Sequence, residues 1–121
     1  MGAYLTIFAG AGLGGMARHA VNMAAAKLGF AFPWGTFTVN VLGSILMGVL
    51  TGWFASRTGM SQQAKLFLTT GLLGGFTTFS SFSWQNVDLL QKGEAGAAMA
   101  NILLSVTLCL LATWGGWRLA R

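Results

Sequence analysis

The chain has 121 residues, of which 55% are hydrophobic and only 7% are charged, with a net charge of +5 and a mean hydropathy of +0.67. Because a soluble domain carries about 25% charged residues, this composition leaves too little polar surface to face water. A single histidine, two acids and one cysteine also exclude soluble acid–base enzymes, metal hydrolases and an intrachain disulfide. We therefore expect an all-helical integral membrane protein that is not an enzyme.

Four long uncharged intervals separate the clustered charges. A spanning helix needs about 20 largely apolar residues to cross roughly 30 Å of hydrocarbon. The intervals 28–56, 66–87 and 95–117 meet that length, and the first interval does so if its helix continues through Arg18 toward Lys27. The sequence therefore predicts one domain over residues 1–121, with four transmembrane helices at 3–27, 34–56, 65–91 and 95–117.

The first helix is expected to be permanent, because its positive charge follows the apolar run, whereas a signal peptide carries that charge in front. Arg18 lies within this span, and no acid deep inside any span neutralises it, because Asp88 and Glu94 are expected near a membrane edge. An arginine at that depth faces a cavity or a partner by default, and snorkelling to the headgroups is the competing interpretation. We expect Arg18 to lie in a wet vestibule that attracts anions.

The second helix follows FAFPWG (residues 30–35), which contains the only proline and predicts a loop. Within this helix, the segment TFTVNVLG (residues 36–43) places Asn40 at membrane depth, which is costly for a polar side chain. Hydrogen bonding between helices is the usual explanation. The alternative is that its amide donates hydrogen bonds to a permeating ion.

The third helix contains the run GGFTTFSSFS (residues 74–83). Gly74 and Gly75 each lower helix stability by about 1 kcal/mol relative to alanine. The nearby hydroxyls can then compete for freed backbone groups; they belong to Thr77, Thr78, Ser80, Ser81 and Ser83. Non-helical backbone at membrane depth persists only where protein or a water-filled cavity covers it. We predict a break that points into the bundle, against the alternative of an unbroken helix whose hydroxyls bond to carbonyls one turn earlier.

Phe76, Phe79 and Phe82 recur at a spacing of three in the same run, which predicts one stripe on a helix. Ordinary packing is the simplest explanation for such a stripe. Because the edge of an aromatic ring is electropositive, ring edges turned inward could instead coordinate a small anion.

The fourth helix has a thin polar track, because Asn101, Ser105 and Cys109 fall on one face at i, i+4 and i+8. Hydrogen bonding between helices explains such a track equally well. Together with the arginine, the asparagine and the hydroxyl run, the track points to passive conduction of a small anion that accepts hydrogen bonds.

Four helices are too few to enclose a path across a membrane, so we expect an oligomer. Small residues at a spacing of four let helix backbones approach closely. These residues indicate where partner helices dock, although such pairs also occur inside any tight bundle; they are Gly10 and Gly14, Ala11 and Gly15, Ser44, Gly48 and Gly52, and Gly71 and Gly75. Four basic residues at one end oppose two at the other, a weak positive-inside bias that would allow insertion in both orientations and an antiparallel, dual-topology homodimer.

The runs GGFTTFSSFS, GxGGxxRH (residues 12–19) and PWGTFTVNVLG (residues 33–43) resemble the Fluc, or CrcB, family of fluoride channels over essentially the whole chain. This resemblance implies an antiparallel homodimer with two pores that exports fluoride passively across the inner membrane of a microbe and keeps cytoplasmic fluoride low. It also implies a structural sodium ion at the dimer centre, no organic cofactor and no nucleic-acid partner.

The resemblance also implies roles for individual residues. The fluoride pore would contain Asn40, Phe79, Phe82, Thr78, Ser80, Ser105 and Asn101; Arg18 would lie in the vestibule, and the carbonyls of Gly74 and Thr77 would bind sodium. The chain departs from the family at Asn101, where some members carry a tyrosine, and at Cys109, where some carry a hydroxyl residue. Phe76 stands where the family is often aliphatic, so we assign it to packing.

Two other functions would fit part of this pattern. A small multidrug transporter also has four helices, but it needs a membrane-embedded carboxylate to exchange protons, and the first helix here contains no acid. A membrane scaffold that transports nothing would explain the glycines and the span lengths. It would leave the arginine, the asparagine and the hydroxyl run unexplained.

Overall fold

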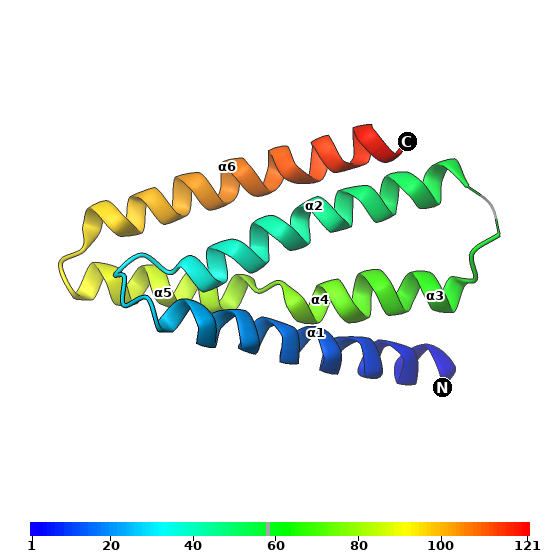
Figure 1. Cartoon of the computed structure of the whole chain (residues 1–121), viewed down its shortest axis with the longest axis horizontal. Helices are drawn as coiled ribbons and strands as arrows, with labels where there is room; N and C mark the ends of the chain where they lie inside the picture. Colours follow the sequence, from blue (N-terminus) through cyan, green and yellow to red (C-terminus); the bar gives the residue numbers. More distant parts are fainter. Residues whose placement is uncertain (58) are drawn as a thin grey trace.

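The computed structural model describes residues 1–57 and 59–121, and these residues form seven helical elements without a strand. The elements are α1 (Gly2–Ala26), α2 (Trp34–Ser56), α3 (Gln62–Leu66), the π-helix η1 (Phe67–Leu73), α4 (Gly74–Phe76), α5 (Phe79–Gln91) and α6 (Ala95–Ala120). Because α3, η1 and α4 follow one another directly, they form one rod (Figure 1). The all-helical expectation is confirmed, and the predicted ranges end within three residues of the observed ones.

The chain runs back and forth along its long axis, so that both termini lie at the same end as the connection between α2 and α3 (Figure 1). The strongest packing joins α2 to α6, and α1 packs against η1 and α4. At the other end, the predicted tight link between α5 and α6 turns at Gly93, whose φ of +77° suits a residue without a Cβ. Its neighbour Glu94 donates a backbone hydrogen bond of 2.8 Å to the Leu89 carbonyl, which closes the end of α5.

The distribution of polar and apolar side chains is reversed relative to a soluble protein. Large hydrophobic side chains cover the outside, as in Phe8 (78% exposed) and Leu119 (89% exposed), whereas Thr36 and Asn101 are each 1% exposed. Within the described residues, α2 and α6 are long and apolar enough to cross a membrane. Arg18 lowers the hydropathy of α1, so α1 is not apolar enough to meet this criterion. The segment from α3 to α5 is broken between α4 and α5, so no single helix in it is long enough.

The small residues at a spacing of four are largely used inside the subunit, so most of them pack helices of one chain and are not evidence for partner docking. A Cβ on Gly14 would collide with the Leu72 backbone, and one on Gly48 would collide with the Thr113 backbone. Gly14 therefore lets α1 pack closely against η1, and Gly48 lets α2 pack closely against α6. Among the glycines of this set, a Cβ would meet nothing within 4 Å only at Gly15.

Two adjacent glycines of α6 provide a matched test of this packing. A Cβ on Gly116 would lie 2.6 Å from the Ile45 carbonyl oxygen and 3.0 Å from the Val49 nitrogen, whereas one on Gly115 meets nothing within 4 Å. Overpacking typically costs about 1–3 kcal/mol. We expect Gly116→Ala to lower the thermal stability measured in detergent by several degrees, and Gly115→Ala to leave it unchanged or raise it. Equal shifts in the two variants would contradict the close approach of α2 and α6.

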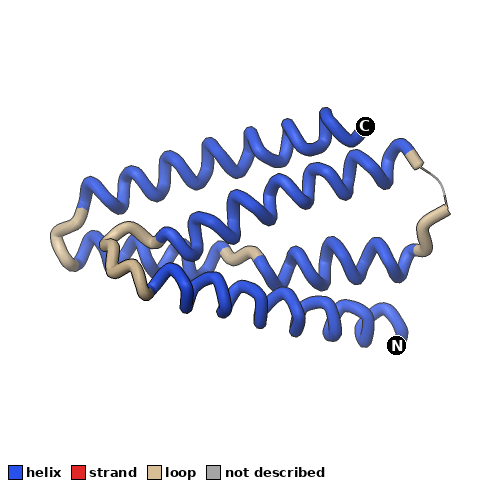
Figure 2. Tube along the Cα trace, in the orientation of Figure 1, coloured by secondary structure: helices blue, strands red, loops and turns tan. Residues whose placement is uncertain are grey.

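The predicted break in the third helix is present, two residues beyond the paired glycines (Figure 2). Thr77 (ψ 158°) and Thr78 (φ −155°) are extended, while Gly74 and Gly75 remain helical. The break therefore lies within the predicted run, at its threonines and not at its glycines. Gly75 instead lets α1 approach, because a Cβ there would lie 2.8 Å from the Cα of Ala11.

The break also divides the predicted phenylalanine stripe. Phe76 ends α4, whereas Phe79 and Phe82 belong to α5 on the other side of the break. The prediction that the three phenylalanines form one stripe on a single helix is therefore wrong. The reason is that the two extended residues between Phe76 and Phe79 interrupt the helical period on which the stripe depended.

Candidate functional site

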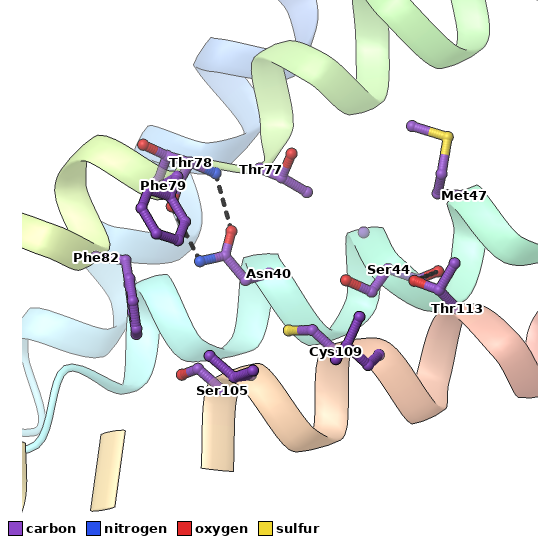
Figure 3. A pocket seen from close by; sticks show the side chains of 13 residues that line it. Asn40, Ser44, Met47, Thr77, Thr78, Phe79, Phe82, Ser105, Cys109 and Thr113 are labelled. Carbon is purple, nitrogen blue, oxygen red and sulfur yellow. Dashed lines mark hydrogen bonds between the residues drawn. The ribbon is translucent and has the colours of Figure 1, made fainter. Parts of the chain in front are cut away.

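Asn40 of α2 holds the break through two reciprocal hydrogen bonds. Its Nδ2 donates to the Thr78 carbonyl oxygen at 3.0 Å, and the Thr78 backbone N–H donates to its Oδ1 at 2.8 Å (Figure 3). In a continuous helix that N–H would donate to the Gly74 carbonyl. The amide of Asn40 thus satisfies the N–H that the break frees at Thr78 and adds a donor to the Thr78 carbonyl, and the Gly74 carbonyl loses its helical donor.

Thr78 also begins α5. Its Oγ1 accepts a hydrogen bond of 3.3 Å from the Ser81 backbone N–H, which is the usual way in which a threonine caps a helix. The N-terminus of α5 therefore lies in the interior of the chain, part-way along the molecule (Figure 2). Because the N-terminal end of a helix carries a partial positive charge, this position favours a negative ion.

Arg18 reaches the same break from α1. Its Nη1 donates to the Thr77 carbonyl oxygen at 3.4 Å, and the side chain is half-buried. The two acids of the chain lie elsewhere: Asp88 pairs with Lys92 at 2.6 Å, and Glu94 lies in the turn before α6. The charge of Arg18 is thus answered by a carbonyl dipole and not by a carboxylate, so it adds to the positive potential near the break.

A cavity of about 400 Å³ opens beside the break, between α2, α5 and α6 (Figure 3). A volume of this size holds several water molecules, each of which occupies about 30 Å³ in the liquid. Hydroxyl, amide, thiol and aromatic groups line it. The lining residues are Asn40, Gly43, Ser44, Met47, Thr77, Thr78, Phe79, Phe82, Ser105, Val106, Cys109, Leu110 and Thr113.

The two phenylalanines of the cavity differ in exposure. Phe82 is 7% exposed and Phe79 is 76% exposed, with ring centroids 5.4 Å apart and ring planes tilted by 45°. The buried ring of Phe82 is held by its own subunit. The exposed ring of Phe79 leaves one side of the cavity without a covering surface in the single subunit.

A buried chain of polar side chains connects α5 and α6 behind Phe82. Ser105 Oγ donates to Asn101 Oδ1 at 3.0 Å, and Asn101 Nδ2 donates to Asn86 Oδ1 at 2.9 Å. Asn86 Nδ2 in turn donates to the Phe82 carbonyl at 2.9 Å. These side chains are at most 5% exposed.

Comparison with known proteins identifies the family of the chain. A family model described as "CrcB-like protein, Camphor Resistance (CrcB)" matches residues 5–117. The chain belongs to the CrcB family.

Curated relatives of this CrcB-family chain share its length. A protein of Methylobacterium nodulans is 58% identical over 102 residues, which cover 84% of this chain and 82% of the relative. A protein of Granulibacter bethesdensis is 50% identical over 117 residues, covering 93% and 92% of the two chains. A third, from Rhodopseudomonas palustris, is 46% identical over 119 residues, covering 98% and 96%. Each is named "Fluoride-specific ion channel FluC", so these relatives are ion channels and not enzymes.

The cavity of this CrcB-family chain brings together five of the seven residues that the sequence predicts for the pore: Asn40, Thr78, Phe79, Phe82 and Ser105. The other two, Ser80 and Asn101, are not among the described residues of its lining. Ser80 is exposed and lies 3.4 Å from Thr78 Oγ1, and Asn101 is buried behind the wall.

Sequence reasoning missed Asn86. A signal for it was present, because Asn86 lies four residues after Phe82 in the same span, and a polar amide there is as unusual as Asn40 is in α2. Its partner on α6 could not be read from the sequence, because it depends on how the two helices pack.

Proposed function

We propose that this protein is a passive, fluoride-selective channel through which fluoride leaves the cell, so that cytoplasmic fluoride stays low. The observation that carries the proposal is the break held by Asn40, which opens onto a cavity lined by amide, hydroxyl, thiol and aromatic groups. No carboxylate is among the described residues of the lining. Relatives named as fluoride-specific channels support the choice of ion.

Selectivity over chloride would follow from size and hydrogen bonding. Fluoride is the smaller halide and the stronger acceptor, and the lining offers it the second Nδ2 hydrogen of Asn40 and the ring of Phe82. The hydroxyls of Thr78 and Ser105 also line the cavity, but each donates its proton to a neighbouring side chain. Arg18 and the N-terminus of α5 add positive potential near the break, which attracts an anion to the cavity. With no acid on the path to exchange protons, transport would be passive.

In the membrane, we propose four transmembrane segments per subunit and an antiparallel homodimer with two pores, in the bacterial inner membrane. Every basic residue at the end that holds both termini lies near an aromatic ring, as interfacial anchors commonly do. The pairs are Arg57 with Trp53, Lys65 with Phe54, Arg118 with Trp114 and Arg121 with Trp117. A second, inverted subunit would cover the exposed ring of Phe79 and complete the open side of the cavity.

We also propose that the carbonyls of Gly74 and Thr77 hold a structural sodium ion between two subunits. The residues fit a hard cation that prefers oxygen ligands. Gly74 is exposed, and its carbonyl has lost its helical donor to Asn40. The Thr77 carbonyl accepts one long bond from Arg18 and keeps a second lone pair. Sodium there would lock the two breaks against each other.

Anion efflux from liposomes that contain the purified protein tests the proposed function. Fluoride and chloride are recorded with ion-selective electrodes, with and without valinomycin as a potassium shunt. We expect fast fluoride efflux that depends on the shunt, with no chloride efflux. Absence of fluoride efflux from a folded, dimeric preparation would refute the proposal and favour the membrane scaffold.

Cys109, the only cysteine, tests whether the cavity is part of the ion path. We expect a small anionic methanethiosulfonate reagent to label it and to remove most of the fluoride flux, since the added sulfonate would place a negative charge on the cavity wall. Cys109→Ser should conduct and be insensitive to the reagent. Complete labelling without loss of flux would place the path outside the cavity.

A further inference from the structure

The buried polar chain behind Phe82 has a direction that a single group imposes. The Phe82 backbone carbonyl can only accept a hydrogen bond, so Asn86 must present its NH₂ group there and turn its Oδ1 toward α6. Asn101 must then donate its own NH₂ to that oxygen, which leaves Asn101 Oδ1 to face Ser105. The chain therefore has one polarity from α5 to α6.

Ser105 stands at the end of this chain and on the cavity wall. Its hydroxyl has one proton, which it donates to Asn101 Oδ1 at 3.0 Å. In this arrangement Ser105 presents lone pairs, and no proton, to the cavity. An anion can receive a hydrogen bond from Ser105 only if the hydroxyl turns away from Asn101 and leaves a buried oxygen without a donor.

We propose that Asn86 and Asn101 are positioning residues that set the direction of the Ser105 hydroxyl and thereby weaken fluoride binding at that point of the pore wall. This inference rests on the proposed function. A wall that donates less strongly holds the ion less tightly, which suits conduction, because a permeating ion must leave each site as well as enter it. Asn86 would act through Asn101 and Ser105, without touching the ion.

Removing one of these hydrogen bonds should change how the flux depends on fluoride concentration. In Asn101→Leu the acceptor is lost, and in Asn86→Leu the side chain of Asn101 is free to turn and donate to Ser105. In both variants the Ser105 hydroxyl can point into the cavity, so the fluoride concentration that gives half-maximal flux should fall by about threefold to tenfold.

Ser105 separates this role from a general loss of packing. We expect Asn86→Leu to change half-saturation no further when it is added to Ser105→Ala, because the group through which it acts is absent. Asn22→Leu, which removes a half-buried amide from α1, should leave half-saturation unchanged. An Asn86→Leu shift that persists in the Ser105→Ala background, or no shift in the single variant, would overturn the proposal.

A second readout needs no transport. The chain has four asparagines, Asn22, Asn40, Asn86 and Asn101, so NMR of protein labelled with ¹⁵N-asparagine gives few side-chain amide signals, which the leucine variants assign. We expect Asn86→Leu to shift the Asn101 side-chain signal and to speed its hydrogen exchange. If that signal does not move, the chain of hydrogen bonds is refuted, whereas a wild type that conducts no fluoride refutes the proposed function.

Discussion

The Asn40→Asp variant is expected to conduct no measurable fluoride. In the wild type, Asn40 accepts a bond of 2.8 Å from the Thr78 N–H and donates one of 3.0 Å to the Thr78 carbonyl. The new carboxylate can still accept the first bond, but it cannot donate the second. It instead places a negative charge against that carbonyl oxygen and beside the proposed path. Because a charge with little compensation is costly at this depth and repels an anion, both binding and passage should fail. Liposome efflux measures the loss.

Folding and conduction can be separated for this variant. Asn40→Leu removes both bonds to Thr78 and leaves the Thr78 N–H without a partner, at a cost of about 1–3 kcal/mol, so it should lower thermal stability without adding a charge to the cavity. Asn22→Asp introduces the same charge on α1, away from the described lining of the cavity, and should conduct. Flux near that of the wild type in Asn40→Asp would remove Asn40 from the ion path.

Phe82→Ile should reduce fluoride flux by about tenfold or more while the protein remains folded. Isoleucine is apolar and fits a buried position, but it has no electropositive ring edge to offer to an anion. The Phe82 ring is 7% exposed, lines the cavity and packs 5.4 Å from the Phe79 ring. A loss of 1.4 kcal/mol of stabilisation on the path corresponds to a factor of about ten.

Phe76→Ile is the matched control for this substitution. Phe76 is 9% exposed, lies on the other side of the break, and is not among the described residues of the cavity lining. Its replacement should cost stability similar to that of Phe82→Ile and leave conduction largely intact. Equal losses of flux in the two variants, with equal losses of stability, would show that packing and not the ring edge explains the role of Phe82.

Local properties of the chain were readable from the sequence. A run of about 20 apolar residues indicates a spanning helix whatever surrounds it. The uncharged intervals therefore predicted the helices to within three residues of their observed ends. The resemblance carried by GGFTTFSSFS and by the segment around Asn40 led to the family that the comparison confirms. The break was also expected in this run, because a weak helix rich in hydroxyls is a local feature.

The sequence could not predict which residues of different helices contact one another. The sequence placed the break within residues 74–80, but its position at Thr77 and Thr78 depends on Asn40, which is 38 residues away from Thr78 and meets it only because α2 packs beside α4 and α5. The glycine pairs were read as docking points for a second chain, and most serve contacts within the subunit. Composition cannot distinguish these uses, since a small residue permits close approach to any helix.

The same limit explains the buried polar chain. Ser105 and Asn101 were expected to share a face, because both belong to one helix and the helical period relates them. Asn86 lies on another helix, and its bond to Asn101 depends on the rotation and the height at which α5 meets α6. A helix fixes the spacing of its own side chains, but only tertiary packing decides which donor meets which acceptor, and hence which way the Ser105 hydroxyl points.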